Sequence, residues 1–537
     1  MVYSSKMSTA IKKKMNLMFK LFLFFYVIIG FYLSINTGIS TDEFIDQYNW
    51  KLNLDAIKDF FGFNDYGYKN LLSYEWKYHG VGFHYISQLY ILVVGSFVKI
   101  ENFSQAVSNV LINHSFIFLT FFLSALLARK ILNLIINDKF FSNIFLIFYL
   151  FYPYLLGHGF YNPKDMPFLF AWLLSSYIGI KIFIQIYKNE NISFLNIFLF
   201  ALSTAFLFSI RISGIMIFLQ YFITLIIIFN ISNKSYFEII KKYLGRSFLF
   251  ASLTLIFTIF FYPLFWLNPL LLVDAINEMK NIQYGVCTLT LGACMDALNL
   301  PSSYLPIWLF FKLPLIILLG LIILPFIEKR IFSSHLRQIL FGSLLLTIIS
   351  ILFLLIFLNV NLYDELRHNL FLIPIILIVS YATIYFFSKK VLLYASILSI
   401  FFFIAQNISM YPYQYTWFNL FSNFVDVNDN FELDYWGVSG RNVARKINNN
   451  EQILLNKDKC IYVAPKHIIE PFISDDYKCV KSFFSIYPKS TEKYTLVKFT
   501  RNIRRENPSN CNLIFEENYN LYIYTKELKM AEVYLCN

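Results

Sequence analysis

The chain has 537 residues, of which 58% are hydrophobic and only 15% are charged. Soluble globular proteins carry about 25% charged residues, so this chain has too few charged residues to form the water-facing surface of a soluble protein of its size. The soluble-enzyme, DNA-binding and disordered classes are therefore excluded, and the composition is that of a polytopic membrane protein. The formal net charge of +12 needs no nucleic-acid partner, because the basic residues fall in short clusters between apolar runs.

A membrane-spanning helix needs about 20 mostly apolar residues, and runs of this kind predict eleven spans. The first run follows Lys12, Lys13 and Lys14 and has no clean cleavage site, so we expect an uncleaved helix with a cytoplasmic N-terminus. The predicted spans are residues 15–35, 109–133, 141–157, 166–187, 193–210, 212–231, 247–267, 305–327, 338–359, 370–387 and 391–408.

The basic residues between these spans are distributed unequally, which predicts the orientation of the chain. The short outer connections hold only Lys164, Arg211, Lys280 and Arg367. The connections assigned to the cytoplasm hold Arg129, Lys130, Lys139, Lys188, Lys234, Lys241, Lys242, Arg246, Lys329, Arg330, Arg337, Lys389 and Lys390.

The segment 81–100 is also apolar enough to span, but it contains His84, Tyr85, Gln88 and Tyr90. If it crossed the membrane, every later connection would change sides and the basic clusters would face outward. We therefore predict a helix lying on the outer membrane face, within a first outer loop of residues 36–108.

The composition changes after residue 408, which predicts a transmembrane domain at 1–408 and a soluble α/β domain at 409–537. Short β-like runs lie at Cys460–Val463, Tyr494–Phe499 and Leu521–Tyr524. A second long outer loop, 268–304, contains Cys287 and Cys294, which are predicted to form a disulfide. All the cysteines fall on the outer side, where disulfides persist, although a zinc site is the competing interpretation. The pairing among the other four stays open: Cys460, Cys479, Cys511 and Cys536.

Two polar clusters on the outer side contain carboxylates, and polar groups near a bilayer are functional candidates. Asp42 and Glu43 follow the first span and suit a general base and a metal ligand, although a helix cap is the simpler interpretation. A second cluster, between two spans, combines an acid and a cation, as a site that binds phosphate and activates a hydroxyl requires. It holds His158, Asn162, Lys164 and Asp165.

Two further clusters suggest phosphate and sugar contacts. Arg367 and His368 can donate to phosphate oxygens, although Arg367 can also pair with Asp364. Arg211 suits either a phosphate ligand or an interfacial anchor. Aromatic and polar residues that suit either a sugar surface or an aromatic belt are Tyr413, Gln414, Glu432, Asp434 and Trp436.

With these residues the chain resembles the GT-C membrane glycosyltransferases, in particular bacterial proteins similar to the dolichyl-phosphate-mannose–protein mannosyltransferases of family 39. The resemblance covers most of the chain. NPKDxPF together with ELDYWG is fairly specific, whereas the Asp-Glu pair is not. The stretches that carry it are Gly157–Phe168 (GHGFYNPKDMPF), Arg367–Pro374 (RHNLFLIP), Tyr411–Asn419 (YPYQYTWFN) and Phe431–Gly437 (FELDYWG).

The resemblance implies a GT-C-like helical fold in the bacterial inner membrane, with the C-terminal domain outside. It also implies transfer of a sugar from a polyprenyl-phosphate donor to an extracytoplasmic hydroxyl of a protein, lipid or glycan. Asp42, with Glu43 beside it, matches the base, and Asp165 matches a second acidic position. Lys164, Arg367 and His368 match the cationic pocket for the lipid phosphate.

The resemblance leaves some matters open. Members of the superfamily differ in their use of a divalent metal, so Mg²⁺ or Mn²⁺ bound by Asp42 and Asp165 stays an alternative. The sugar and the acceptor are not indicated. The rival functions are a transporter or flippase for a lipid-linked sugar, and a polymerase or ligase of surface glycans that shares the same donor. Against the transporter stand the acids and bases at the ends of spans and the absence of an internal repeat.

Overall fold

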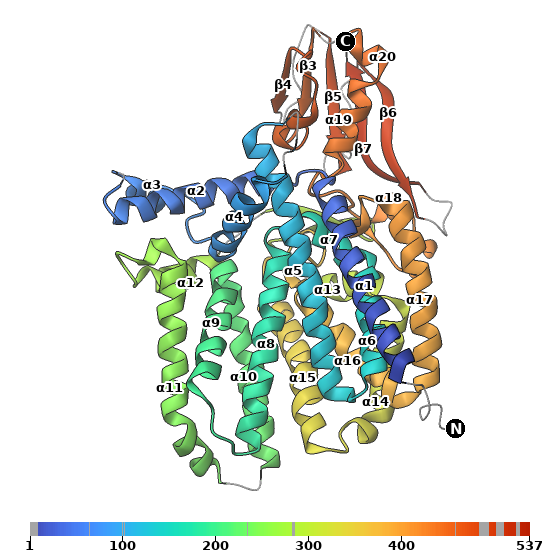
Figure 1. Ribbon diagram of the computed structural model, residues 1–537. Coiled ribbons are helices and arrows are strands. Elements are labelled where there is room, and N and C mark those ends of the chain that lie inside the picture. Colours follow the sequence, from blue (N-terminus) through green and yellow to red (C-terminus); the bar gives the residue numbers. More distant parts are fainter. Residues whose placement is uncertain are drawn as a thin grey trace.

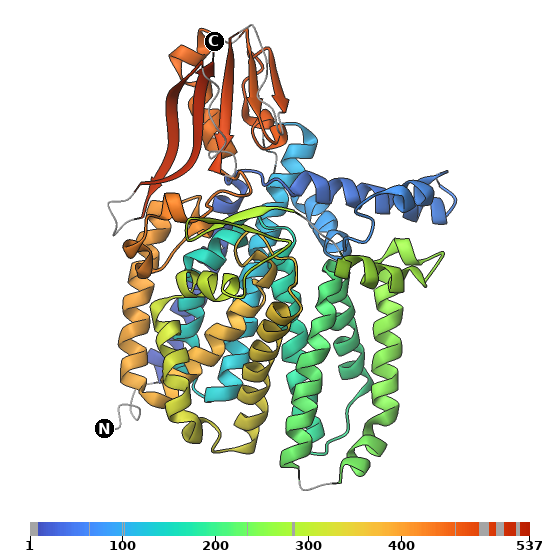
Figure 2. The same cartoon turned by 180° about the vertical axis from the view of Figure 1, so that it is seen from behind.

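The computed structural model describes residues 9–63, 65–98, 100, 103–232, 235–281, 285–456, 458–482, 493–500, 510–521 and 527–536. A layer of long helices carries a small β-sheet at one end (Figures 1 and 2). Helix α1 (Thr9–Ile35) begins at the end of the layer far from the sheet, whereas the last strand, β7 (Glu527–Cys536), lies within the sheet.

Within the described residues, seven helices are long and apolar enough to cross a membrane, or up to nine if each of two bent pairs counts as one span. The chain is thus a mostly helical, multi-pass membrane protein by helix length and composition. Besides α1, the long helices are α5 (Gln105–Ile136), α8 (Asp165–Tyr187), η1 and α10 together (Ile212–Ile231), α11 (Tyr236–Phe261), α15 (His335–Phe357) and α17 (Lys389–Met410).

The bent pairs differ from the straight spans that the sequence predicts. α6 (Lys139–Phe151) and α7 (Pro153–Tyr161) meet at 60°, and α13 (Tyr304–Lys312) and α14 (Leu315–Ile331) meet at 118°. Pro153 and Pro314 stand at the two breaks, where a proline cannot donate to the preceding turn. The sequence places residues 158–161 between two predicted spans, but they belong to α7.

Three shorter apolar helices complete the set: α4 (Gly82–Gly95), α9 (Phe194–Ile210) and α16 (Leu372–Phe387). Figure 1 shows α9 and α16 within the helical layer, whereas α4 lies with α2 (Glu43–Phe60) and α3 (Gly67–Ser73) at the end next to the sheet. Eleven spans therefore stay a prediction that requires α9 and α16 to cross. The first loop ends at Ser104 and not at residue 108, because Ser104 caps α5.

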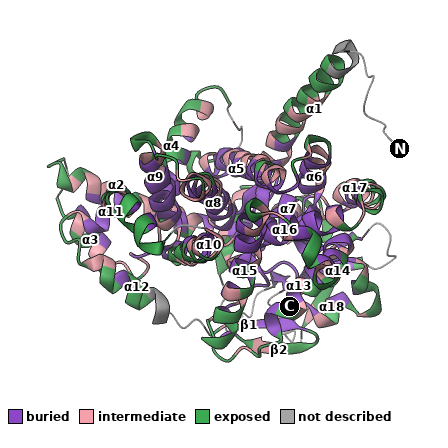
Figure 3. Cartoon of the chain, turned by 90° about the horizontal axis from the view of Figure 1, so that it is seen from below, coloured by how far each residue is buried: buried purple, intermediate pink, exposed green. Residues whose placement is uncertain are grey.

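Burial divides the layer into a centre and a rim. Figure 3 shows buried residues gathered in α5, α7, α8 and α16, and exposed ones on α1, α11 and α17. The exposed face of α1 is apolar, with Phe24, Phe25, Ile28 and Ile29 on its surface. Such a rim suits contact with lipid.

The helix ends farthest from the sheet hold the basic clusters. They include the end of α5, the starts of α6, α11, α15 and α17, and the ends of α8 and α14. Lys234, also assigned to this group, lies outside the described residues. All the other cytoplasmically assigned residues therefore share one end of the bundle.

The C-terminal part forms a mixed five-stranded sheet in the order β4-β3-β5-β7-β6. β3 (Cys460–Val463) pairs in parallel with β4 (Cys479–Ser482) and β5 (Tyr494–Phe499), and β7 pairs antiparallel with β5 and β6 (Cys511–Asn520). Of the third predicted strand, Leu521 is not in a strand and residues 522–524 lie outside the described residues. A core that includes Val443, Ile461 and Val497 joins this sheet to α19 (Gly440–Asn448) and the adjacent α20 (Glu451–Leu454).

Three disulfide bonds in the described residues each link two strands. Cys287 and Cys294 join β1 (Cys287–Thr290) to β2 (Ala293–Asp296) in the loop after α12 (Leu271–Asn281). The pairings that the sequence leaves open are Cys460–Cys479, between β3 and β4, and Cys511–Cys536, between β6 and β7.

The segment between α17 and the sheet packs onto the first loop. It contains η4 (Gln414–Thr416), η5 (Leu420–Phe424) and α18 (Val427–Asn430). The backbone N–H of Thr41 donates to the carbonyl of Trp436 at 3.0 Å, and Arg441 donates to the carbonyls of Ile35 and Thr37 at 2.9 and 3.1 Å. These bonds hold the residues after α1 against the C-terminal part.

Close packing between α7 and η4 gives a stability prediction. A Cβ at Gly157 would lie 2.0 Å from the backbone nitrogen of Tyr415, so Gly157→Ala should destabilise the protein by about 1–3 kcal/mol. At Gly245 on α11 a Cβ would meet no atom of the described residues within 4 Å, so Gly245→Ala should be neutral or stabilising. Thermal unfolding in detergent checks both, and equal Tm values for the two variants would contradict the packing argument.

Candidate functional site

A cavity of about 510 Å³ lies where the first loop, the sheet-side ends of the helices and the C-terminal part meet. Its wall includes the apolar residues Ile210, Ile212, Met216, Leu355 and Val360. It also includes the polar residues Asp42, Asp46, Lys164, Arg211, Arg367 and His368. The cavity therefore combines an apolar surface from helix ends with a cluster of charges.

Each of the three cations that line this cavity holds a carboxylate. Arg367 Nη1 lies 3.0 Å from Asp42 Oδ2, and Lys164 Nζ lies 3.0 Å from Asp46 Oδ1. Arg211 pairs with Asp165. Because Asp42 and Asp46 are separated by one turn at the start of α2, both reach the bundle from the same helix face.

Arg367 is the most enclosed of these cations, with a side chain only 7% exposed. It lies in η3 (Arg367–Asn369), and its Nε lies 3.3 Å from Asp364 Oδ2 and donates to His368 Nε2 at 3.2 Å. Its guanidinium carbon lies 4.9 Å from the ring centre of Tyr363 and 5.1 Å from that of Trp436. Asp364 and the two aromatic rings thus fix the orientation of the Arg367 guanidinium fork, and its Nη1 donates to Asp42.

The electrostatics favour an ionised Asp42 and neutral imidazoles at His79 and His368. Enclosure by protein raises the pKa of Asp42, but Arg367, Lys164 and Arg211 together outweigh this and leave the pKa below its ordinary value. Burial and the same cations lower the pKa values of His79 and His368 well below the ordinary value, so both rings are neutral at pH 7. His368 therefore accepts from Arg367 and does not add positive charge.

Several predicted site residues lie outside the cavity wall. Glu43 points to the interior, where it accepts from the Ser40 N–H and contacts His114 Nε2, each at 2.6 Å. His158 is fully buried on α7, and Asn162 accepts from the backbone N–H of Asp165 at 2.8 Å. The structure thus separates Glu43 from Asp42, although the two are adjacent in sequence.

The aromatic cluster is divided in the same way. Asp434 and Trp436 line the cavity, whereas Tyr413, Gln414 and Glu432 are buried away from it. Asp434 accepts from the hydroxyl of Tyr415 and from the backbone N–H of Ser439, and burial raises its pKa. Asp434 therefore lines the cavity and also stabilises, through its hydrogen bonds, the loop of residues 434–439.

Asp46 and Lys312 are residues that the sequence reasoning missed. Asp46 is one helical turn beyond Asp42, a spacing that is informative only once α2 is known to be a helix. Lys312 stands alone in the apolar run 305–327, and a lone intramembrane lysine is a functional signal by itself.

Lys312 forms a buried ion pair with Glu365, beneath the loop that carries Arg367. The two side chains are 0% exposed, and Lys312 Nζ lies 3.0 Å from Glu365 Oε1. The ring of Phe418 lies 3.9 Å from the same nitrogen. Burial raises the pKa of Glu365 to about 7, although Lys312 opposes the shift. The pair anchors the 364–367 loop to the break between α13 and α14.

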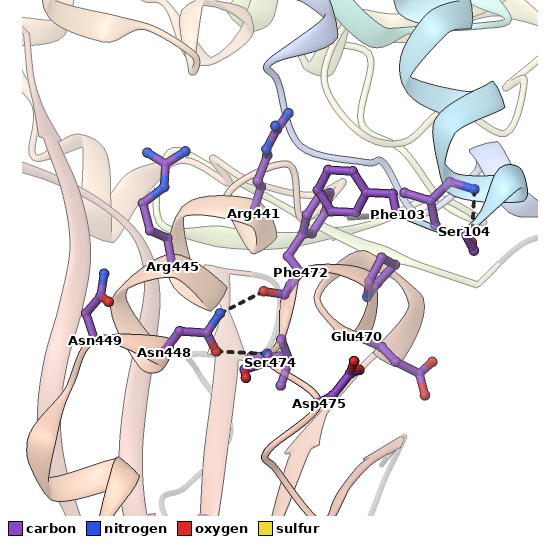
Figure 4. Close-up of a pocket in the computed structure, with 13 residues that line it drawn as sticks. Phe103, Ser104, Arg441, Arg445, Asn448, Asn449, Glu470, Phe472, Ser474 and Asp475 are labelled. Atoms are coloured by element: carbon purple, nitrogen blue, oxygen red, sulfur yellow. Dashed lines mark hydrogen bonds between the residues drawn. The ribbon is translucent and has the colours of Figure 1, made fainter. Parts of the chain in front are cut away.

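A second, larger cavity of about 780 Å³ lies between the start of α5 and the C-terminal part (Figure 4). Phe103, Arg441, Arg445 and Phe472 line it, and Arg441 already donates to two carbonyls at the end of α1. None of the residues that the sequence singles out lies in its wall. The smaller cavity is therefore the candidate site.

The described residues contain no group of three or more His, Cys, Asp or Glu side chains that could hold a metal ion. Asp42 and Asp165, the proposed metal ligands, are each bonded to an arginine.

Comparison with protein-family models, with curated proteins and with solved structures finds no significant match to this chain.

The Lys312–Glu365 pair gives a stability prediction. Lys312→Met leaves a buried carboxylate without its cation and should cost about 3–5 kcal/mol, whereas Lys312→Met with Glu365→Gln should recover much of that loss. Lys389→Met is the matched control, because Lys389 is 56% exposed and its pair with Asp138 should contribute at most about 1 kcal/mol. Unfolding of the purified variants measures these differences; a Lys312→Met variant as stable as the control would contradict the assignment.

Proposed function

We propose that this protein is a membrane glycosyltransferase that transfers a sugar from a polyprenyl-phosphate donor to an extracytoplasmic hydroxyl. The observation that carries the proposal is the Asp42–Arg367 pair in a cavity that is lined by both apolar and charged residues. A polyprenyl-phosphate sugar has the same two parts, because a long apolar chain is joined to an anionic phosphate. The resemblance to GT-C enzymes of family 39 supports the same function and remains part of the proposal.

The charged residues of the cavity wall supply groups for the bond breaking, the charge transfer and the proton transfer of this reaction. The bond between the anomeric carbon and the phosphate oxygen breaks, and its electron pair leaves with the phosphate. Arg367 and Lys164 are placed to stabilise that growing charge, since preorganised cations act strongly where water is excluded. Asp42 accepts the proton of the acceptor hydroxyl as its oxygen bonds to the same carbon. The indole of Trp436 and the aromatic residues Trp76 and Tyr78 in the wall suit the faces of a sugar ring.

The orientation follows from the separation of charges along the bundle. The basic clusters share the end away from the sheet, and the cavity and disulfides share the other end. We propose that the first end is cytoplasmic and the second extracytoplasmic, in a bacterial inner membrane, because basic connections stay inside and disulfides persist outside.

Reporter fusions test this orientation. Alkaline phosphatase fused after Asn537 should be active, because the enzyme folds only outside the cytoplasm, whereas a fusion in the α8–α9 connection after Lys188 should be inactive. The reverse pattern would overturn the orientation, and two active fusions would overturn the span assignment between them.

Substitution of Asp42 tests the chemistry. Mass spectrometry of envelope glycans from a deletion strain would first identify the missing sugar and thus the donor. With that donor, Asp42→Asn should lower turnover by about 10²–10⁴-fold, because general-base assistance is lost, without weakening donor binding. Arg367→Ala should weaken both donor binding and turnover. Asp55→Asn, on the same helix and paired with Lys58 outside the cavity, is the control and should leave turnover unchanged.

The outcomes separate the base assignment from the function. Near-normal turnover by Asp42→Asn would remove Asp42 as the base and leave Asp165 or Glu43 to be tested next. Continued transfer by the double variant Asp42→Asn, Asp165→Asn would remove both carboxylates as the base, whereas a purified wild-type protein that transfers no sugar from that donor would contradict the glycosyltransferase proposal itself.

A further inference from the structure

Each of the three cations of the cavity is paired with a carboxylate. The three carboxylates differ in how strongly the rest of the protein fixes them in place. Asp165 is only 3% exposed and is fixed by Asn162, which donates to Asp165 Oδ2 at 3.0 Å and accepts from its backbone N–H at 2.8 Å. The side chain of Asp42 is 32% exposed at the cavity. Among the described residues, the side chain of Asp46 bonds only to Lys164. Asp42 and Asp46, whose side chain is 11% exposed, are therefore held by fewer bonds than Asp165.

A carboxylate and a phosphate present the same features to these cations. Each offers at least two oxygens that share negative charge, and the guanidinium fork binds either one through paired N–H groups. An arginine as enclosed as Arg367 is costly to leave without an anion, and Asp42 and Asp364 supply that anion. Because Asp364 lies on the Nε side, an exchange of anions at Nη1 leaves the orientation of the fork intact.

We infer that the donor phosphate binds by taking the places of Asp42 on Arg367 and of Asp46 on Lys164, and that this exchange releases Asp42 to act as the base. The inference rests on the proposed function and adds an order to it, in which the donor binds before the acceptor can be deprotonated. Asp165 and Arg211 stay paired throughout and hold α8 to α9.

The exchange would also raise the pKa of Asp42 and so make it a stronger base. Paired with Arg367, Asp42 has a lowered pKa and is a poor proton acceptor. A phosphate anion on Arg367 and Lys164 cancels most of the positive charge that Asp42 experiences, and the enclosing protein then favours its protonated form. Donor binding thus converts a structural carboxylate into a base, and the acceptor is activated only when a sugar is present to receive it.

Binding of sugar-free polyprenyl phosphate to the full-length protein in nanodiscs tests the exchange without requiring turnover. Asp42→Asn and Asp46→Asn should each bind the probe about 3–10-fold more tightly than the wild type, since the phosphate no longer competes with a carboxylate. Arg367→Gln should bind it at least about 10-fold more weakly. Asp55→Asn should bind like the wild type.

A double-mutant cycle separates competition for Arg367 from a general gain in positive charge. If Asp42 competes through Arg367, then Asp42→Asn should no longer tighten binding in the Arg367→Gln background. Tightening that persists there, or an Asp42→Asn variant that binds like the wild type or more weakly, would overturn the exchange and leave the glycosyltransferase proposal standing. A wild-type protein that binds no polyprenyl phosphate would overturn both.

Discussion

The ion pairs between the first loop and the ends of the helices are the constraint on which the candidate site depends. Asp42 precedes α2 and Asp46 lies in its first turn, outside the bundle. Their partners Arg367 and Lys164 lie at the sheet-side ends of the layer. Charges this close to an apolar bundle are costly unless they are paired. The pairs therefore fix the loop over the helix ends, and a cavity with both charged and apolar walls results.

Contacts on the far side of the 364–367 loop and of the first loop hold these ion pairs in place. The break between α13 and α14 places Lys312 beneath the 364–367 loop, and Glu365 ties that loop down while Asp364 and Arg367 face the cavity. On the other side, the backbone N–H and the side-chain hydroxyl of Thr41 both donate to the carbonyl of Trp436, which brings the C-terminal part to the residue before Asp42. Segments more than 300 residues apart in the chain thus supply neighbouring groups.

Much of the fold is predictable because its signals are local. Apolar runs and basic clusters predict the helical layer and its polarity, and β-like runs predict β3 and β5 with the bounds that the structure has. The breaks after Phe151 and Lys312 were not predicted, because apolar composition continues across them. The side on which α4 lies was argued from the parity of the basic clusters and not from its own residues.

The candidate site is predictable as a set of residues but not as a set of partners. The sequence indicates that Asp42, Lys164, Arg211 and Arg367 belong together, because all of them flank spans at one end. It cannot indicate that Glu43 points toward His114 while Asp42 points toward Arg367, since a helix start directs adjacent side chains about 100° apart. Asp46 was missed for the related reason that it comes to lie beside Asp42 only when residues 43–60 form a helix.

A structure of the protein with its polyprenyl-phosphate sugar donor bound tests the central claim most directly. Cryo-electron microscopy of the Asp42→Asn variant in nanodiscs, which should hold the donor without turnover, would locate the phosphate. We predict phosphate oxygens within hydrogen-bond distance of Arg367 and Lys164, the prenyl chain along Ile212, Met216 and Leu355, and the anomeric carbon facing residue 42. A donor bound elsewhere, with the Lys164–Asp46 pair intact, would contradict this account.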